Sequence, residues 1–186
     1  MKIWIAGSMH TGTTIMCQII KDLMDVKYNG TEHALLVAAN HDILKGTRWN
    51  KEPVTKQLRV RKSMMEVMNC PSVLKDPMLV MTWPVWLEHE AGPDRWIICM
   101  RSPEPLVHSW SGLPHELHNR RLAVAQQITS SFELAQYSHS IIVTIPDDLN
   151  ANRYARKVAA ITGLKEIDCL EVVKKYLKPE RYTKRG

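Results

Sequence analysis

The sequence predicts an α/β protein in which helices cover both faces of a central parallel sheet, giving three layers (α/β/α). Two observations lead to this prediction. Short apolar runs that are typical of buried strands alternate along the chain with longer segments whose apolar residues recur at helical spacing. Each of the four strand-like runs is also followed by polar or glycine-rich sequence, as expected where a parallel sheet carries a site at the carboxyl ends of its strands.

The first half of the chain is expected to hold two strands. Residues 2–6 form a short apolar strand. The apolar residues of the next segment fall on one side of a helix: Ile15, Met16, Ile19, Ile20, Leu23 and Met24. Residues 32–48 are either a helix or a loop. Residues 52–69 are expected to form a helix, and residues 72–74 the second strand.

The second half of the chain alternates in the same way. Residues 95–100 (Arg-Trp-Ile-Ile-Cys-Met) are the most strand-like run of the sequence. One helix is expected to end at Gly163, because glycine readily adopts the left-handed conformation of a helix C-cap. The remaining expected elements are helices near 83–91, 104–111, 118–136, 151–162 and 168–177, and a strand over 140–145.

Length and composition bound the class of protein. A chain of 186 residues is expected to form one domain, residues 1–186, that is large enough for a hydrophobic core. No segment approaches the length of about 18 apolar residues that a membrane span needs, and no cleavable apolar stretch precedes the first strand, so neither membrane insertion nor export is expected. The four cysteines are far apart and form no C-x-x-C pair, which predicts reduced thiols in a cytoplasmic protein.

The formal net charge of +6 suits an anionic ligand. Part of this excess lies near the C-terminus, where it is typical of a solvated basic tail: Lys174, Lys175, Lys178, Arg181, Lys184 and Arg185. The sequence holds no motif of a nucleic-acid-binding protein. We therefore expect no nucleic-acid partner.

A glycine-containing loop follows the first strand and leads into the first helix. Gly7 and Gly12 have the spacing of a Walker A loop, G-x-x-x-x-G-K-[ST], but Thr13 stands at the position of its lysine. The glycines allow successive N–H groups to point inward, and the helix presents its positive end. The loop is therefore expected to hold a phosphate or sulfate group in a P-loop NTPase-like fold, from a donor other than a triphosphate. The plain alternative is an ordinary turn between a strand and a helix.

Polar residues follow the three other strands as well: Lys75 and Asp76, Arg101 with Ser109 two helical turns further on, and the acidic pair 147–148. Because the carboxyl ends of parallel strands meet at one edge of a sheet, these side chains are expected to lie near the glycine loop. Each of them alone can be a surface or capping residue. Their joint occurrence favours a single active site.

These motifs resemble those of the sulfotransferase family, enzymes that use 3′-phosphoadenosine 5′-phosphosulfate (PAPS). Residues 11–14 (Thr-Gly-Thr-Thr) match the last four positions of the family's loop, P-[KR]-[ST]-G-T-[TS]. A second family signature is an apolar strand, then Arg-[DS]-P, then a serine eight residues past the arginine. Here residues 96–103 end in Arg-Ser-Pro, and Ser109 follows Arg101 at that spacing.

Two further segments extend the resemblance, so that it spans residues 3–164 in the family's order. Residues 73–77 (Val-Leu-Lys-Asp-Pro) are similar to the K-D-P element of tyrosylprotein and several bacterial sulfotransferases. Residues 141–149 are similar to the family's late strand and Y-E-D-L segment, and residues 162–164 (Thr-Gly-Leu) stand in place of its L-G-L.

The resemblance implies roles for individual residues. Arg101 and Ser109 would bind the 3′-phosphate of PAPS, and an arginine at a strand end can converge with a hydroxyl on the next helix upon one phosphate. Lys75 would approach the transferring sulfuryl group. No metal site is expected. The 5′-phosphosulfate would be held by Gly7, His10, Thr11, Gly12, Thr13 and Thr14, with His10 replacing the family's lysine or arginine by a cation that titrates near neutrality.

The implied reaction is in-line transfer of a sulfuryl group from PAPS to a hydroxyl or amine, which leaves 3′,5′-ADP. A base must take the acceptor's proton, and cations, here Lys75 and His10, must stabilise the charge that develops on the sulfuryl oxygens and the leaving phosphate. Glu32 lies where tyrosylprotein and trehalose-type sulfotransferases have a catalytic glutamate, although it can also cap the next helix. The rival bases are His33, His41 and, less favoured, His108.

The acceptor is expected to be a small molecule, a sugar or a peptide. The residues that could line its pocket, or else belong to the core, are Trp49, Trp83, Trp86, Trp110 and residues 115–118.

Two other functions stay open. A degenerate P-loop kinase for a nucleotide or small molecule would use residues 73–76 as a metal-binding strand end. A non-catalytic nucleotide-binding protein would need no base. The sequence leaves the acceptor and the oligomeric state open.

Overall fold

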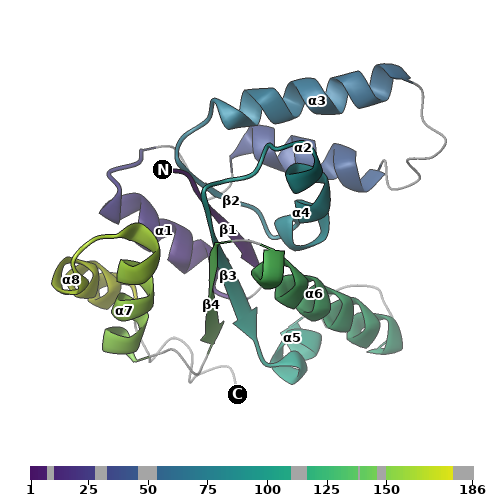
Figure 1. The fold of residues 1–186 in the computed structure, drawn as a ribbon. Coiled ribbons are helices and arrows are strands. Elements are labelled where there is room, and N and C mark those ends of the chain that lie inside the picture. Colours follow the sequence, from purple (N-terminus) through teal and green to yellow (C-terminus); the bar gives the residue numbers. More distant parts are fainter. Residues whose placement is uncertain are drawn as a thin grey trace.

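The computed structural model describes residues 1–7, 11–27, 33–45, 54–109, 117–137, 139–145 and 150–177. Four parallel strands in these residues form one sheet, with helices on both of its faces (Figure 1). The strands lie in the order β2-β1-β3-β4. They are β1 (Ile3–Gly7), β2 (Val73–Lys75), β3 (Arg95–Arg101) and β4 (Ser140–Ile145). The predicted three-layer α/β/α class and all four predicted strands are confirmed.

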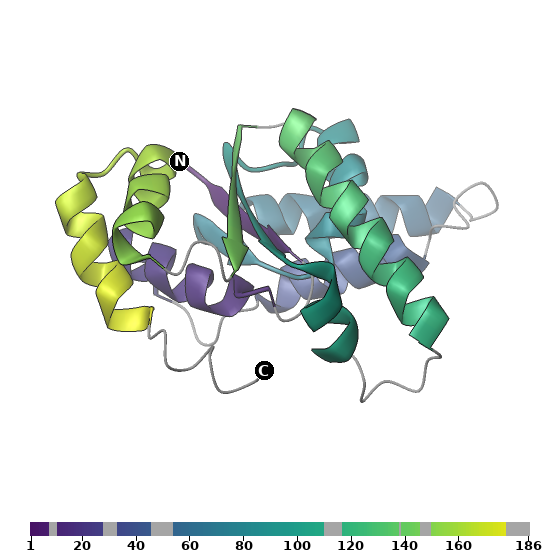
Figure 2. The ribbon, with the colours of Figure 1, turned by 90° about the horizontal axis from the view of Figure 1, so that it is seen from below.

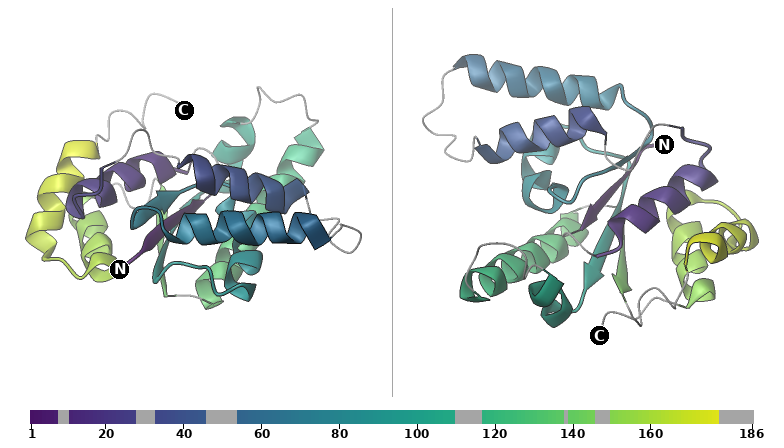
Figure 3. Two further views of the ribbon diagram at one scale, coloured as in Figure 1. Left: turned by 90° about the horizontal axis from the view of Figure 1, so that it is seen from above. Right: turned by 180° about the vertical axis from the view of Figure 1, so that it is seen from behind.

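Eight helices occur in the described residues: α1 (Thr13–Leu23), α2 (Ala34–Lys45), α3 (Val54–Met68), α4 (Leu79–Glu88), α5 (Pro103–Ser109), α6 (Leu117–Tyr137), α7 (Ala151–Thr162) and α8 (Glu166–Tyr176). Helices α1, α7 and α8 cover one face of the sheet, and α2, α3, α4 and α6 cover the other. Figure 3 shows α2 and α3 side by side above the second of these faces. The segment that the sequence left as helix or loop is therefore helical over α2.

Helix α4 begins at Leu79, earlier than the start near residue 83 that the sequence predicted. Proline is typical of a first helical turn, but Pro84 lies inside this helix. It has no N–H to donate to the carbonyl of Val80, four residues earlier. The Ser130 hydroxyl of α6 donates to that carbonyl instead. A partner from another helix therefore makes the internal proline tolerable.

The core has two parts, one on each face of the sheet, because successive side chains of a strand point to opposite faces. Ile3 and Ile5 pack with α1, α7 and α8, whereas Trp4 packs with α2, α4 and α6. Trp4 makes edge-to-face contacts with Trp86 and Trp96, with ring centroids 4.9 and 5.6 Å apart. These aromatic contacts lie in the middle of the fold.

Two tryptophans proposed for an acceptor pocket belong to this core. Trp86 is completely buried, and Trp83 is buried with its Nε1–H donating to Ser130 Oγ at 2.9 Å. Of the two alternatives that the sequence left open, a pocket or the core, the core is the one observed for these two residues. Trp49, Trp110 and residues 115–116 lie outside the described residues, as do the side chains of 117–118.

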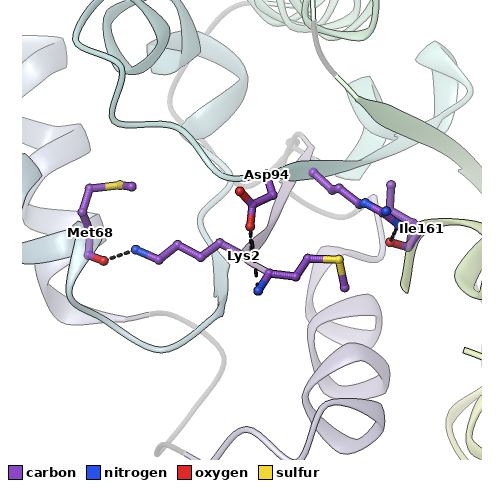
Figure 4. A network of polar contacts seen from close by, with 6 residues as sticks. Lys2, Met68, Asp94 and Ile161 are labelled. Carbon is purple, nitrogen blue, oxygen red and sulfur yellow. Dashed lines mark hydrogen bonds and ion pairs between the residues drawn. The ribbon is translucent and has the colours of Figure 1, made fainter. Parts of the chain in front are cut away.

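The amino-terminal edge of the sheet is fastened by main-chain and side-chain hydrogen bonds (Figure 4). The N–H of Lys2 donates to Asp94 Oδ2 at 2.6 Å, and the Lys2 ammonium group donates to the Met68 carbonyl. On the same edge, Arg95 donates to the Ile161 carbonyl at the end of α7. These contacts join β1, β3, α3 and α7.

All four cysteines are free thiols, as predicted. Cys17, Cys99 and Cys169 are buried and Cys70 is half-buried. None of the helices in the described part of the chain combines the length and the apolar character that crossing a bilayer requires.

Candidate functional site

The carboxyl ends of the strands meet at the edge from which α1 and α5 begin (Figure 2). In the registers of the sheet, Ile5 pairs with Lys75 and Gly7 pairs with Cys99. Strand β3 continues for two residues beyond that pair and ends at Arg101. Lys75, Gly7 and Arg101 therefore stand at the ends of three neighbouring strands, with Gly7 in the middle.

A glycine is required at position 7 because its backbone lies close to β3. Its φ is 151°, and a Cβ at this position would lie 2.4 Å from the Cys99 carbonyl oxygen. The same Cβ would lie 2.8 Å from Thr11 Oγ1 and 2.9 Å from Thr13 Cγ2. Thr11 and Thr13 are both buried, and their side chains pack against Gly7 at the end of β1. Residues 8–10, and with them His10, lie outside the described residues.

Gly12 is the N-cap of α1 and has the left-handed conformation, with φ 86°. Gly12 has no side chain that could cap this end, and the first turn of α1 holds no acidic residue. The first N–H groups of a helix have no acceptor within the helix, so they can bind an anion at this position. Thr14, in the first turn, is exposed. The predicted strand, glycine loop and helix are thus present, with both glycines in conformations that other residues rarely adopt.

Lys75 is buried and lies on the same face of the sheet as α1, since it shares the parity of Val73 in β2. Burial raises the pKa of the Cys99 thiol on β3 to about 12, the positive charge of Lys75 lowers this pKa, and Cys17 of α1 adds to the rise. The Lys75 ammonium group therefore lies near the start of the glycine loop.

Asp76 lies on the opposite face of the sheet, next to α2 and α4. Its Oδ2 accepts a hydrogen bond of 2.8 Å from Asn40 Nδ2, and its Oδ1 accepts one of 2.9 Å from the N–H of Met78. Both carboxylate oxygens are therefore engaged in holding the turn between β2 and α4. Asn40 was not singled out by the sequence. The feature of the sequence that could have pointed to Asn40 is its place as a polar residue within the buried apolar stripe of α2, which is formed by Leu36, Ala39 and Ile43.

Arg101 ends β3 on the face that it shares with Cys99, which is also the face of Lys75 and α1. It is half-buried, and its Nε is buried without a hydrogen-bond partner among the described residues. A buried charged donor without an acceptor is costly, and a bound anion would satisfy it. Ser109, the proposed partner of Arg101, is the last residue of α5, and its side chain is outside the described part of the chain.

Helix α5 is held against α6 by a small apolar cluster of Leu106, Val107 and Val124. Arg120 lies one helical turn before Val124 on α6, and its Nε is also buried with no hydrogen-bond partner in the described residues. Sequence reasoning missed Arg120, because nothing in its local sequence distinguishes it from the neighbouring Arg121.

The candidate bases fall in different places. Glu32 is outside the described residues. His33 lies at the amino-terminal edge of the sheet, where its Nδ1 is 3.7 Å from Cys70 Sγ, and β1 separates that edge from the glycine loop by roughly 13 Å. His33 is therefore not placed to act as a base at the loop. His41 is exposed on the side of α2 away from its buried stripe, and His108 is exposed at the end of α5.

No family model and no curated protein matches this chain. In the described residues, no group of three His, Cys, Asp or Glu side chains could hold a metal ion. The site is therefore defined by its geometry: Gly7 at the end of β1, with Lys75 at the end of the strand on one side and Arg101 at the end of the strand on the other.

Proposed function

We propose that this protein is a sulfotransferase that uses PAPS and releases 3′,5′-ADP. One observation supports this most directly: Lys75 and Arg101 share a face of the sheet and end the two strands that flank the glycine loop. PAPS carries anionic groups at two places, the 5′-phosphosulfate and the 3′-phosphate. A loop that binds one anion, with a cationic side chain on each side of it, suits such a donor better than a single phosphate.

In the proposed reaction the acceptor oxygen or nitrogen attacks sulfur as the bond between sulfur and the 5′-phosphate oxygen breaks. The α1 N-terminus, Lys75 and His10 stabilise the charge on the sulfuryl oxygens and on the leaving phosphate. Arg101 and Ser109 hold the 3′-phosphate and so orient the donor. Glu32 takes the proton of the acceptor. The position of His33 at the other edge of the sheet counts against His33 as the base, and it gives no preference to Glu32, which is its direct neighbour in the chain.

The kinase alternative requires a carboxylate at the end of β2 that can hold a metal ion. Asp76 is the residue in question, and it is buried with both oxygens accepting hydrogen bonds from Asn40 and Met78. A metal ion would have to displace these donors. This arrangement disfavours a kinase.

The acceptor is proposed to be a small molecule, a sugar or a peptide, and the free cysteines favour a cytoplasmic location.

A calorimetric titration tests the proposal. The protein should bind 3′,5′-ADP more tightly than ATP, and magnesium should not reverse this order. Preference for ATP with magnesium would contradict the proposal in favour of a kinase. Incubation with PAPS and a panel of hydroxyl and amine acceptors then separates a transferase from a protein that only binds nucleotides, because only the transferase forms 3′,5′-ADP in an acceptor-dependent way.

A further inference from the structure

Asn40 is the centre of a buried polar network that no step of the proposed reaction uses. It is completely buried on α2, and its amide group has three partners. Nδ2 donates to Asp76 Oδ2 at 2.8 Å. Oδ1 accepts from Thr82 Oγ1 at 2.7 Å and from Trp86 Nε1 at 2.8 Å. The network thus joins α2, the end of β2 and α4.

The direction of these hydrogen bonds is fixed by chemistry. The indole Nε1 of Trp86 can only donate, so the atom of Asn40 that faces it must be the amide oxygen. The amide nitrogen must then face Asp76. Asp76 receives a second donor from the N–H of Met78, so both of its oxygens act as acceptors. This arrangement favours the ionised carboxylate and holds it in one orientation.

The network lies at the carboxyl end of β2, a short strand that pairs with β1 over only three residues. β2 is only three residues long, and Lys75 is its last residue. Because Lys75 and Asp76 project to opposite faces, holding Asp76 against α2 and α4 fixes the direction in which Lys75 projects towards the glycine loop. We infer that Asn40 is a positioning residue for Lys75, acting through Asp76. This inference rests on the proposed function, in which Lys75 contacts the sulfuryl group.

Replacement of Asn40 by aspartate, Asn40→Asp, tests this role, because it keeps the shape of the side chain and changes only its donor. Two carboxyl groups at hydrogen-bond distance do not both ionise readily, so one of them keeps a proton and has a raised pKa. While that proton is present, the new carboxyl group can donate to Asp76 as the amide did. When pH rises and the proton is lost, two negative charges repel each other and the strand end is no longer held.

The experiment compares turnover of PAPS, the affinity for 3′,5′-ADP and the thermal midpoint of wild type, Asn40→Asp and the control Asn69→Asp, whose site is exposed. As pH rises through the raised pKa of the carboxyl pair, kcat of Asn40→Asp should fall progressively below wild type, to roughly 10²-fold below it. Its affinity for 3′,5′-ADP, which lacks the sulfuryl group, should stay within a few-fold of wild type. Asn69→Asp should follow wild type throughout.

Two results would overturn the role of Asn40. One is an Asn40→Asp protein whose kcat equals that of wild type over the whole pH range. The other is a loss of kcat that is matched by the loss of 3′,5′-ADP affinity at every pH, which is the result expected from a merely loosened fold. If wild type itself neither turns over PAPS nor binds 3′,5′-ADP, the proposed function fails, and the role of Asn40 fails with it.

Discussion

Lys75 and Asp76 are neighbours in the chain, yet they serve opposite faces of the sheet. Asp76 accepts hydrogen bonds from Asn40 and Met78 between α2 and α4, while Lys75 lies on the face of α1 and acts on Cys99. The same short strand therefore carries an anchor on one side and a cation for the candidate site on the other.

Lys75→Met should lower kcat for PAPS by about 10²- to 10³-fold and change the affinity for 3′,5′-ADP much less. The reason is that the lysine is proposed to contact the sulfuryl group, which 3′,5′-ADP lacks. Steady-state kinetics and calorimetry measure the two quantities. Lys62→Met on the exposed face of α3 is the matched control. Equal losses of turnover and product affinity would contradict the role of Lys75.

Gly7→Ala should destabilise the protein by at least about 2 kcal/mol, because the added Cβ would meet the Cys99 carbonyl at 2.4 Å. Gly163→Ala is the control. Gly163 also has a positive φ, 77°, but no atom of the residues described in the structure lies within 4 Å of a Cβ there, so its cost should be only the backbone strain of about 1–2 kcal/mol. Urea unfolding measures both free energies. Similar losses for the two variants would show that Gly7 does not lie against the Cys99 carbonyl as described.

The thiol of Cys99 should resist alkylation in the native protein. Burial raises its pKa to about 12 from 9.0, so almost no thiolate is present at pH 8. The folded protein therefore holds the Cys99 proton more tightly than the unfolded chain does. The free energy of unfolding keeps the full contribution of this group below pH 9.0 and loses it as pH rises towards 12. Mass spectrometry after iodoacetamide treatment should show Cys99 modified only after unfolding. Rapid modification in the folded state would contradict its burial.

His10 is predicted to make donor binding depend on pH. An imidazolium beside the bound anion should be favoured in its charged form, so affinity for 3′,5′-ADP should fall as pH rises between about pH 5.5 and 8.5. His10→Lys should remove this dependence and tighten binding, whereas His10→Ala should remove it and weaken binding. Calorimetry at several pH values tests this, and constant affinity of wild type over the range would exclude His10 as a phosphate ligand.

The sequence predicted those parts of the fold that depend on local pattern. The strands are nearly continuous apolar runs, and each was found within a residue or two of its observed bounds. Gly163 ends α7 in the left-handed conformation, as its position in the sequence predicted. The two glycines that flank the loop could also be recognised in the sequence, because positions 7 and 12 have positive φ angles, which favour glycine.

The features that the sequence could not predict depend on partners far along the chain. The start of α4 was missed because the carbonyl left free by Pro84 is satisfied by Ser130, which is 50 residues from Val80. Asn40 acquires its role only when α2 is brought to Asp76, 36 residues away. The sequence left a pocket or the core open for Trp83 and Trp86, and only their packing in three dimensions places them in the core.

The most direct measurement is a calorimetric comparison of 3′,5′-ADP with 5′-AMP, made on wild type and on Arg101→Ala. The account predicts that wild type binds 3′,5′-ADP more tightly, because the guanidinium group of Arg101, whose Nε lacks a partner among the described residues, binds the 3′-phosphate. Arg101→Ala should lose most of this preference while keeping its affinity for 5′-AMP. Equal affinity of wild type for the two nucleotides, or an equal loss for both in the variant, would contradict the account.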